Sequence, residues 1–182
     1  MILQRVSTAN ARNSVIQMPA PLEATMFAIV PSRPEVGDMN DKVWTHLSVV
    51  PWVSLGDFRH EALQEIEGVV KQSMPVHLEP GRMMTVGGEG HEKKAQDITS
   101  EELRELHKKL LTTLGGFGVV VSHPEWAWNN YRPHITHPKP MLLRPAEENS
   151  LYVIDNLAIG GDARGTKLIS QCFHGEREPD ET

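Results

Sequence analysis

The chain has 182 residues, a length typical of one domain or of two small lobes that share a core. Its net charge of −6 at pH 7 argues against broad electrostatic binding of duplex nucleic acid. Cys172 is the single cysteine, so no intramolecular disulfide forms, and no segment reaches the ~18–20 apolar residues of a membrane span. We therefore expect a protein of the reducing cytoplasm, with a small anionic ligand or the end of a nucleic-acid strand as its partner.

Both ends of the chain are predicted to lie outside the folded domain. Residues 1–23 are polar and carry proline, which indicates a flexible N-terminal arm, and residues 174–182 form an acidic tail. Between them, residues 24–173 alternate short apolar runs with amphipathic segments. This order predicts a single domain of the α+β class.

The first half of this domain predicts strands, a helix and a hairpin. Its first three segments are a strand at 24–31, a turn-rich loop at 33–42 and a strand at 44–52. A helix is expected after an N-cap at Asp57, with Ala62 and Ile66 on its buried face. Residues 75–88 are expected to form a hairpin that turns at Pro80-Gly81.

The second half predicts another helix followed by strands. The polar stretch 87–97 is expected to be a surface loop, with a lid over a ligand as the alternative. Thr99 and Glu102 fit a capping box for a helix that Gly115-Gly116 ends. Its apolar stripe is Leu103, Leu106, Leu110 and Leu114. Further strands are expected at 117–123, 131–138, 151–161 and 166–173.

Two predicted strands each carry a histidine followed, two residues later, by a hydroxyl. His46 precedes Ser48 and His134 precedes Thr136, and these are the only two of the nine histidines with this spacing. Side chains at i and i+2 of a strand point to the same face, so each pair presents an imidazole beside a hydroxyl. Two structural histidines are the plainer alternative.

This set of side chains suits cleavage of a ribose phosphodiester. One imidazole removes a proton from the attacking hydroxyl or water, and the other protonates the leaving oxygen. The pKa of imidazole lies near neutrality, so one ring can be neutral while its partner is charged. The two hydroxyls can donate hydrogen bonds to the non-bridging phosphate oxygens. This chemistry requires neither a metal nor a cofactor.

The two motifs resemble those of the two-histidine (2H) phosphoesterase superfamily. "THLSVV" matches its first motif and "RPHIT" the second, including the proline that commonly precedes the second histidine. The resemblance covers about residues 24–173. It implies two pseudo-symmetric lobes of antiparallel sheet with outer helices and a central groove. It also implies that His46 and His134 are the acid/base pair and that Ser48 and Thr136 bind the phosphate, with the assignment of acid and base left open.

The resemblance implies a metal-independent phosphodiesterase and leaves its substrate open. Family members act on RNA 2′,3′-cyclic phosphates, on 2′,5′ linkages, or on cyclic oligonucleotide signals, as in phage proteins that blunt bacterial immunity. A nucleotide-binding module that sequesters its ligand without turnover is the alternative. The sequence departs from the family pattern at His137-Pro138, where the family continues with an apolar strand residue. His137 is expected to face solvent, with a substrate contact as the alternative.

Four further residues are candidates for substrate contacts. Trp44 and Trp52 share the strand parity of His46 and could stack on a base, and the same parity places Val50 on that face. Arg132 is in register with His134 and could balance a phosphate charge, whereas Tyr131 is out of register unless the strand bends. Packing in the core is the alternative for each aromatic residue. Cys172 is expected to be a small buried hydrophobe, and no metal site is predicted, because the histidines lack a Cys or carboxylate ligand pattern.

Overall fold

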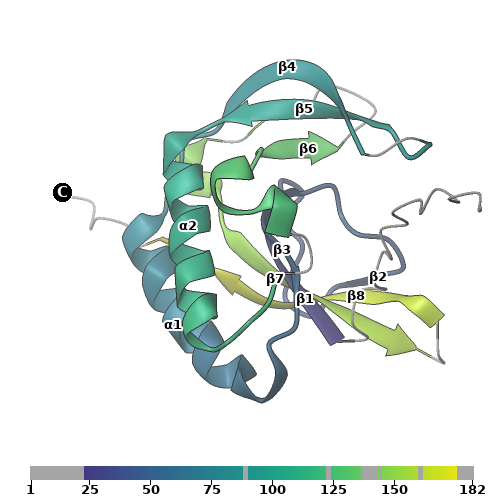
Figure 1. Cartoon of the computed structure of the whole chain (residues 1–182), viewed down its shortest axis with the longest axis vertical. Helices are drawn as coiled ribbons and strands as arrows, with labels where there is room; N and C mark the ends of the chain where they lie inside the picture. Colours follow the sequence, from purple (N-terminus) through teal and green to yellow (C-terminus); the bar gives the residue numbers. More distant parts are fainter. Residues whose placement is uncertain are drawn as a thin grey trace, which may run out of the picture.

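The structure is a computed structural model that describes residues 23–87, 90–121, 124–136, 143, 145–159 and 162–175. Within these ranges the chain forms one eight-stranded antiparallel sheet and two α-helices (Figure 1). The prediction of an α+β fold is therefore confirmed. Most of the predicted arm and tail lies outside the described residues. No helix in the described part is long and apolar enough to cross a membrane.

The sheet has the strand order β2-β8-β7-β1-β3-β6-β5-β4, and every adjacent pair is antiparallel. In chain order the strands are β1 (Glu23–Ile29), β2 (Met39–Asn40), β3 (Leu47–Val53), β4 (Glu79–Val86), β5 (Lys93–Thr99), β6 (His134–Thr136), β7 (Leu151–Ile159) and β8 (Asp162–Phe173). The helices are α1 (Arg59–Ser73) and α2 (Glu101–Gly116), with short 3-10 turns η1 (Gly56–Phe58), η2 (Pro124–Trp126), η3 (Trp128–Asn130) and η4 (Ala146–Glu148). The strands that carry the two histidine motifs, β3 and β6, are therefore neighbours.

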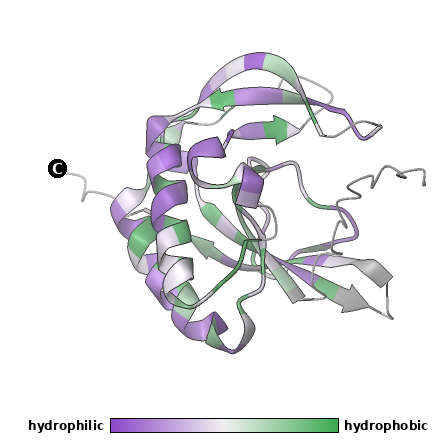
Figure 2. Cartoon of the chain, viewed as in Figure 1, coloured by the Kyte–Doolittle hydropathy of each residue, from purple (hydrophilic) through white to green (hydrophobic). Residues whose placement is uncertain are grey.

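The main hydrophobic core lies between the two helices and one face of the sheet (Figure 1). Ile66 of α1 and Leu110 of α2 are fully buried there against Phe27, Leu47 and Ile135 of the sheet. Both helices alternate hydrophobic and hydrophilic residues along their length, as helices with one buried face do (Figure 2). The predicted leucine stripe of α2 is confirmed, because all four leucines are buried.

The opposite face of the sheet, called here the helix-free face, carries a second apolar cluster. Its buried members come from β1, from the residue that follows β1, and from β7 and β8: Met26, Ala28, Val30, Tyr152, Ile154 and Ile169. Trp44, Trp52 and Cys172 pack against this cluster and are partly buried. Strand alternation explains the division, since Phe27 and Ile29 between these residues point to the helices. The sheet is therefore apolar on both faces of β1.

The predicted hairpin turn at Pro80-Gly81 is wrong. Strand β4 runs through both residues and pairs with β5, and the turn lies between Val86 and Lys93. Proline has no N–H to donate, and β4 tolerates Pro80 because it is the edge strand of the sheet. The pairing of β4 with β5 has a register shift directly after Pro80. A Cβ at Gly81 would lie 3.1 Å from the backbone oxygen of Asp97, so glycine here serves close strand approach. Much of the expected loop 87–97 is consequently β5.

The two helices begin close to the predicted positions but with different caps. Phe58 occupies the N-cap position of α1 and makes no capping hydrogen bond, while Asp57 lies in η1. Ser100 caps α2, where its Oγ accepts a hydrogen bond from the N–H of Leu103 at 3.0 Å. The expected strand at 117–123 is reduced, within its described residues, to an isolated bridge between Val53 and Val121.

Candidate active site

The two histidine motifs meet where β3 and β6 pair. Leu47 is paired with Ile135, and both side chains are fully buried in the main core. Antiparallel pairing extended by one residue on each side sets His46 opposite Thr136 and Ser48 opposite His134. Alternation then points all four side chains away from the helices. The described structure thus brings together, on the helix-free face, the four residues that sequence spacing singled out.

The contact that Ser48 makes supports this orientation. Its Oγ lies 3.4 Å from the sulfur of Met26, which belongs to the apolar cluster of the helix-free face. Ala28, another member of that cluster, pairs with Ser48 across β1 and β3. The Ser48 hydroxyl is therefore on the face opposite the main core.

The two imidazoles are held by the same backbone contact. Nδ1 of His46 lies 2.6 Å from the carbonyl oxygen of Trp44, and Nδ1 of His134 lies 2.8 Å from that of Arg132. A carbonyl oxygen only accepts, so Nδ1 carries the proton in each ring. In the neutral form this leaves the lone pair on Nε2, and in the charged form it leaves an Nε2–H. Both rings therefore have Nε2 as the atom that can exchange a proton.

The electrostatic environment favours a neutral His46. Burial lowers the pKa of His46 from its usual value, the Trp44 carbonyl opposes this shift, and positive charge on His134 lowers the pKa further. The repulsion from His134 also indicates that the two rings are close enough to interact through space. His46 is therefore an imidazole that its surroundings keep neutral.

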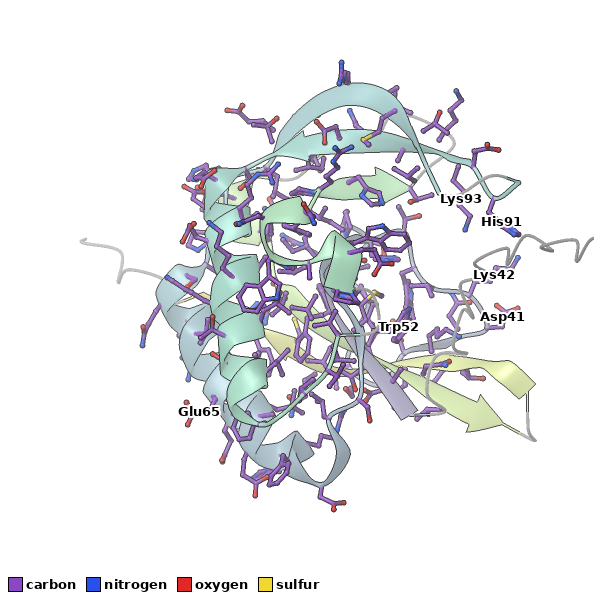
Figure 3. The ribbon with its side chains drawn as sticks, viewed as in Figure 1. Asp41, Lys42, Trp52, Glu65, His91 and Lys93 are labelled. Carbon is purple, nitrogen blue, oxygen red and sulfur yellow. The ribbon has the colours of Figure 1, made fainter. Side chains whose placement is uncertain are left out.

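Trp44 and Trp52 border the motif on the helix-free face, where both pack against the apolar cluster. Trp52 lies near the centre of the molecule in Figure 3. The expectation for Val50 is wrong: it is fully buried in the main core. Ala28 pairs with Ser48 and Phe27 pairs with Val50, so β3 contains one extra residue between these two pairs, and its alternation reverses there. A second register shift precedes the pairing of Val53 with Thr25.

Arg132 and Tyr131 occupy different environments. The Arg132 side chain is exposed, and its backbone carbonyl holds His134. Tyr131 is only 6% exposed and belongs to the main core, where its hydroxyl donates to the carbonyl oxygen of Ser48 at 2.7 Å. That placement does not bring Tyr131 to the helix-free face. Tyr131 therefore contacts the backbone of the first motif from the side of the main core.

His107 is the residue near the site that sequence reasoning missed. It is fully buried in α2 and stacks on Tyr131, with ring centroids 3.9 Å apart and 10° between the planes. Its Nδ1–H donates to the carbonyl of Val49 at 2.6 Å, and its Nε2 accepts from the N–H of Trp128 at 3.0 Å. The available signal was its position among Leu103, Leu106 and Leu110, which predicts a buried polar side chain.

Tyr131 and His107 together tie the first motif to the chain that leads into the second. The carbonyls of Ser48 and Val49 lie just beyond the single β3–β6 pair, and the two side chains satisfy them. Arg104 of α2 reinforces the arrangement by donating to the carbonyl of Tyr131 at 2.7 Å. The spacing of the two histidines therefore depends on polar contacts from α2 as well as on the sheet.

Acid should weaken the fold through His107. Burial lowers its pKa, the Val49 contact opposes this, and Arg104 and Lys108 lower it further, so the native ring stays neutral when the unfolded ring is protonated. The unfolded state then binds the extra proton as pH falls below about 6.5, and the free energy of unfolding should drop by up to ~1.4 kcal/mol per pH unit for this group.

Urea unfolding at several pH values between 5 and 7.5 measures this effect. In His107→Gln the slope of unfolding free energy against pH should be smaller than in the wild type by the contribution of one proton. His46, whose pKa is also lowered, should contribute a further part of the slope. Equal slopes in the wild type and His107→Gln would contradict a neutral, buried His107.

Asp97 is a further polar neighbour of the site. It pairs with His134 across β5 and β6, so the two side chains leave the sheet on the same face. Ala95 in turn pairs with Thr136. The row of residues across the sheet at the level of His134 thus runs from Ser48 through His134 to Asp97.

Other reactive groups lie apart from this row. Among the described residues no three His, Cys, Asp or Glu side chains gather where a metal ion could be held. Cys172 is partly buried beside the apolar cluster, its sulfur is 3.7 Å from Nε2 of His174, and burial raises the pKa of its thiol. His137 and Pro138 lie outside the described residues.

A scan against protein-family models and a search of curated proteins both return no match.

Proposed function

We propose that this protein is a metal-independent phosphodiesterase that cleaves ribose-linked phosphodiesters by two-histidine acid/base catalysis. One observation carries the proposal: the pairing of Leu47 with Ile135 directs the two imidazoles to one face of the sheet. In each ring, Nδ1 contacts the backbone carbonyl two residues earlier. A hydroxyl accompanies each imidazole at the position that alternation requires. Two chance histidines would have no reason to share both the face and the backbone contact.

In the proposed mechanism His46 is the base and His134 the acid. Nε2 of neutral His46 takes the proton of the attacking ribose hydroxyl or water as its oxygen bonds to phosphorus. The bond from phosphorus to the leaving oxygen breaks, and that oxygen takes the proton from Nε2 of His134. The Ser48 and Thr136 hydroxyls donate to the non-bridging oxygens, where negative charge is concentrated. Solvent restores both protonation states after the step.

The lowered pKa of His46 is the reason for this assignment. A base must be neutral before the reaction, and burial together with the charge of His134 keeps His46 neutral. The Trp44 carbonyl, which accepts from Nδ1, then stabilises the imidazolium that forms when His46 takes the proton. His134 occupies the opposite side of the Leu47–Ile135 pair, as an acid that acts on the leaving group requires.

We further propose that β3 and β6 mark the boundary between two lobes of the 2H phosphoesterase kind. Strands β1 and β3 with α1 belong to the first lobe, and β5 and β6 with α2 belong to the second. Each lobe would supply one imidazole and one hydroxyl. The proposed substrate is a nucleotide, because Trp44 and Trp52 border the phosphate position with ring surface on which a base can stack.

A panel of substrates in excess chelator tests the proposal. It comprises 2′,3′-cyclic nucleotides, 2′,5′-linked and 3′,5′-linked dinucleotides and cyclic oligonucleotides. We expect turnover of at least one class that chelator does not reduce. Binding without turnover by the wild type would favour a sequestering module, and neither binding nor turnover across the panel would overturn both readings.

A further inference from the structure

Strand β5 places a lysine on the same face as the histidines. Ala95 pairs with Thr136, and Lys93 is two residues along the same strand, so its side chain leaves the sheet on the helix-free face. Two residues of a strand span about 6.8 Å, so the backbone of Lys93 lies about that far along β5 from Ala95, the partner of Thr136. Lys94, between them, points to the opposite face. Lys93 is exposed at the hairpin end of β5.

A second lysine lies at the same edge of the molecule. In Figure 3 Lys93 and His91 belong to the end of the β4–β5 hairpin, and Lys42 lies below them on the chain between β2 and β3. Lys42 is also only two residues from Trp44, which packs on the helix-free face. Both lysines are exposed. The hairpin and the loop thus each present a cation at the end of the face beyond His46 and Thr136.

These cations are not used to stabilise the fold in the part of the chain that is described. Lys71 and Lys108 of the helices pair with Glu67 and Glu105, whereas neither Lys42 nor Lys93 forms an ion pair with a described carboxylate. Exposed lysines that pair with no carboxylate are available to an anionic ligand. In a chain with a net charge of −6, they place two positive charges at one end of that face, although each is next in sequence to a carboxylate, Asp41 or Glu92.

We propose that Lys93, assisted by Lys42, forms a second phosphate subsite one nucleotide away from the scissile phosphate. This inference rests on the proposed function and narrows its substrate to an oligonucleotide, linear or cyclic, with at least two phosphates. The scissile phosphate lies between His46 and His134, and the next phosphate contacts the ammonium of Lys93. Trp44, at the same end of the face, is then placed to stack on the base between them.

Lys93→Ala and Lys94→Ala form a matched pair for the test, since they remove the same charge from opposite faces of one strand. The probes are a 2′,3′-cyclic mononucleotide, with one phosphate, and a cyclic dinucleotide, with two. In Lys93→Ala the ratio of KM for the dinucleotide to KM for the mononucleotide should rise about tenfold, the effect of one charge-assisted contact. In Lys94→Ala that ratio should stay at the wild-type value.

Salt dependence and direct binding complete the test. The slope of log KM for the dinucleotide against log salt should fall by roughly 0.7 in Lys93→Ala. An unchanged KM ratio in Lys93→Ala, or equal effects in the two variants, would overturn the subsite. If the wild type cleaves neither these probes nor any other substrate of the panel, the proposed function fails separately. The subsite is then decided by binding of a labelled cyclic dinucleotide, which Lys93→Ala must weaken about tenfold more than Lys94→Ala.

Discussion

His134→Ala and His46→Ala are each expected to lower kcat/KM for phosphodiester cleavage by about 10²–10⁴-fold, the usual contribution of a positioned acid or base. Each substitution removes an Nε2 that exchanges a proton with the reacting oxygens. Both rings are only partly buried and lie outside the main core, so the free energy of unfolding should change little. Initial rates with the cleaved substrate, together with urea unfolding of the same preparations, measure the two effects.

His60→Ala is the control for these variants. His60 is an exposed histidine at the start of α1, and its removal should leave both the rate and the stability at wild-type values. Because the two histidines act in one step, the double variant should be little slower than the slower single variant. A His134→Ala rate within about threefold of the wild type would remove His134 from the mechanism.

Ile135→Ala is expected to lower the free energy of unfolding by about 2–5 kcal/mol. The Ile135 side chain is fully buried in the main core, directly opposite Leu47, and truncation leaves a cavity between the sheet and the helices. Leu47→Ala should cost a similar amount for the same reason. Urea unfolding followed by circular dichroism gives the free energies, provided that the m-value is unchanged.

Thr136→Ala supplies the contrast to Ile135→Ala. Thr136 is exposed and points to the helix-free face, so its loss should change stability by less than about 0.5 kcal/mol while the rate falls. Consecutive positions 134, 135 and 136 should therefore alternate between loss of rate and loss of stability. A cost under about 1 kcal/mol for Ile135→Ala would mean that the strand faces are assigned the wrong way round.

Strand alternation predicted which side chains share a face where the strands are regular. The expectation that His46 and Ser48 share a face, with Leu47 opposite, needs only two residues of extended chain. The same reasoning failed at Val50, because an extra residue in β3 reverses the alternation directly after Ser48. A bulge depends on the pairing of two strands distant in sequence, and local pattern does not reveal it.

The errors in the hairpin and in the cap have a similar origin. Pro80-Gly81 has the composition of a turn, but the edge position of β4 tolerates the proline and the approach of Asp97 uses the glycine. Thr99 and Ser100 both offer a capping hydroxyl, and only the backbone geometry selects Ser100. Both predictions were wrong because the pairing of β4 with β5 and the backbone geometry at the start of α2 are not set by local composition.

The contacts around His107 were outside the reach of sequence reasoning for a different reason. The helix pattern indicates that His107 is buried, but its partners Val49 and Trp128 come from segments on either side of α2. Tyr131 is likewise defined by contacts with His107 and Ser48, which are distant in sequence. Spacing along the chain locates candidate pairs on a strand, whereas the contacts around those pairs require the fold.

The pH dependence of kcat/KM in excess chelator tests two-histidine catalysis most directly. The profile should be bell-shaped, because His46 must be neutral and His134 charged. Since the pKa of His46 is lowered, the rise on the acid side should lie below about pH 6.5, and His134→Ala should abolish the fall on the alkaline side. A wild-type rate that stays flat from about pH 5 to 9, with chemistry shown to be rate-limiting, would contradict the mechanism.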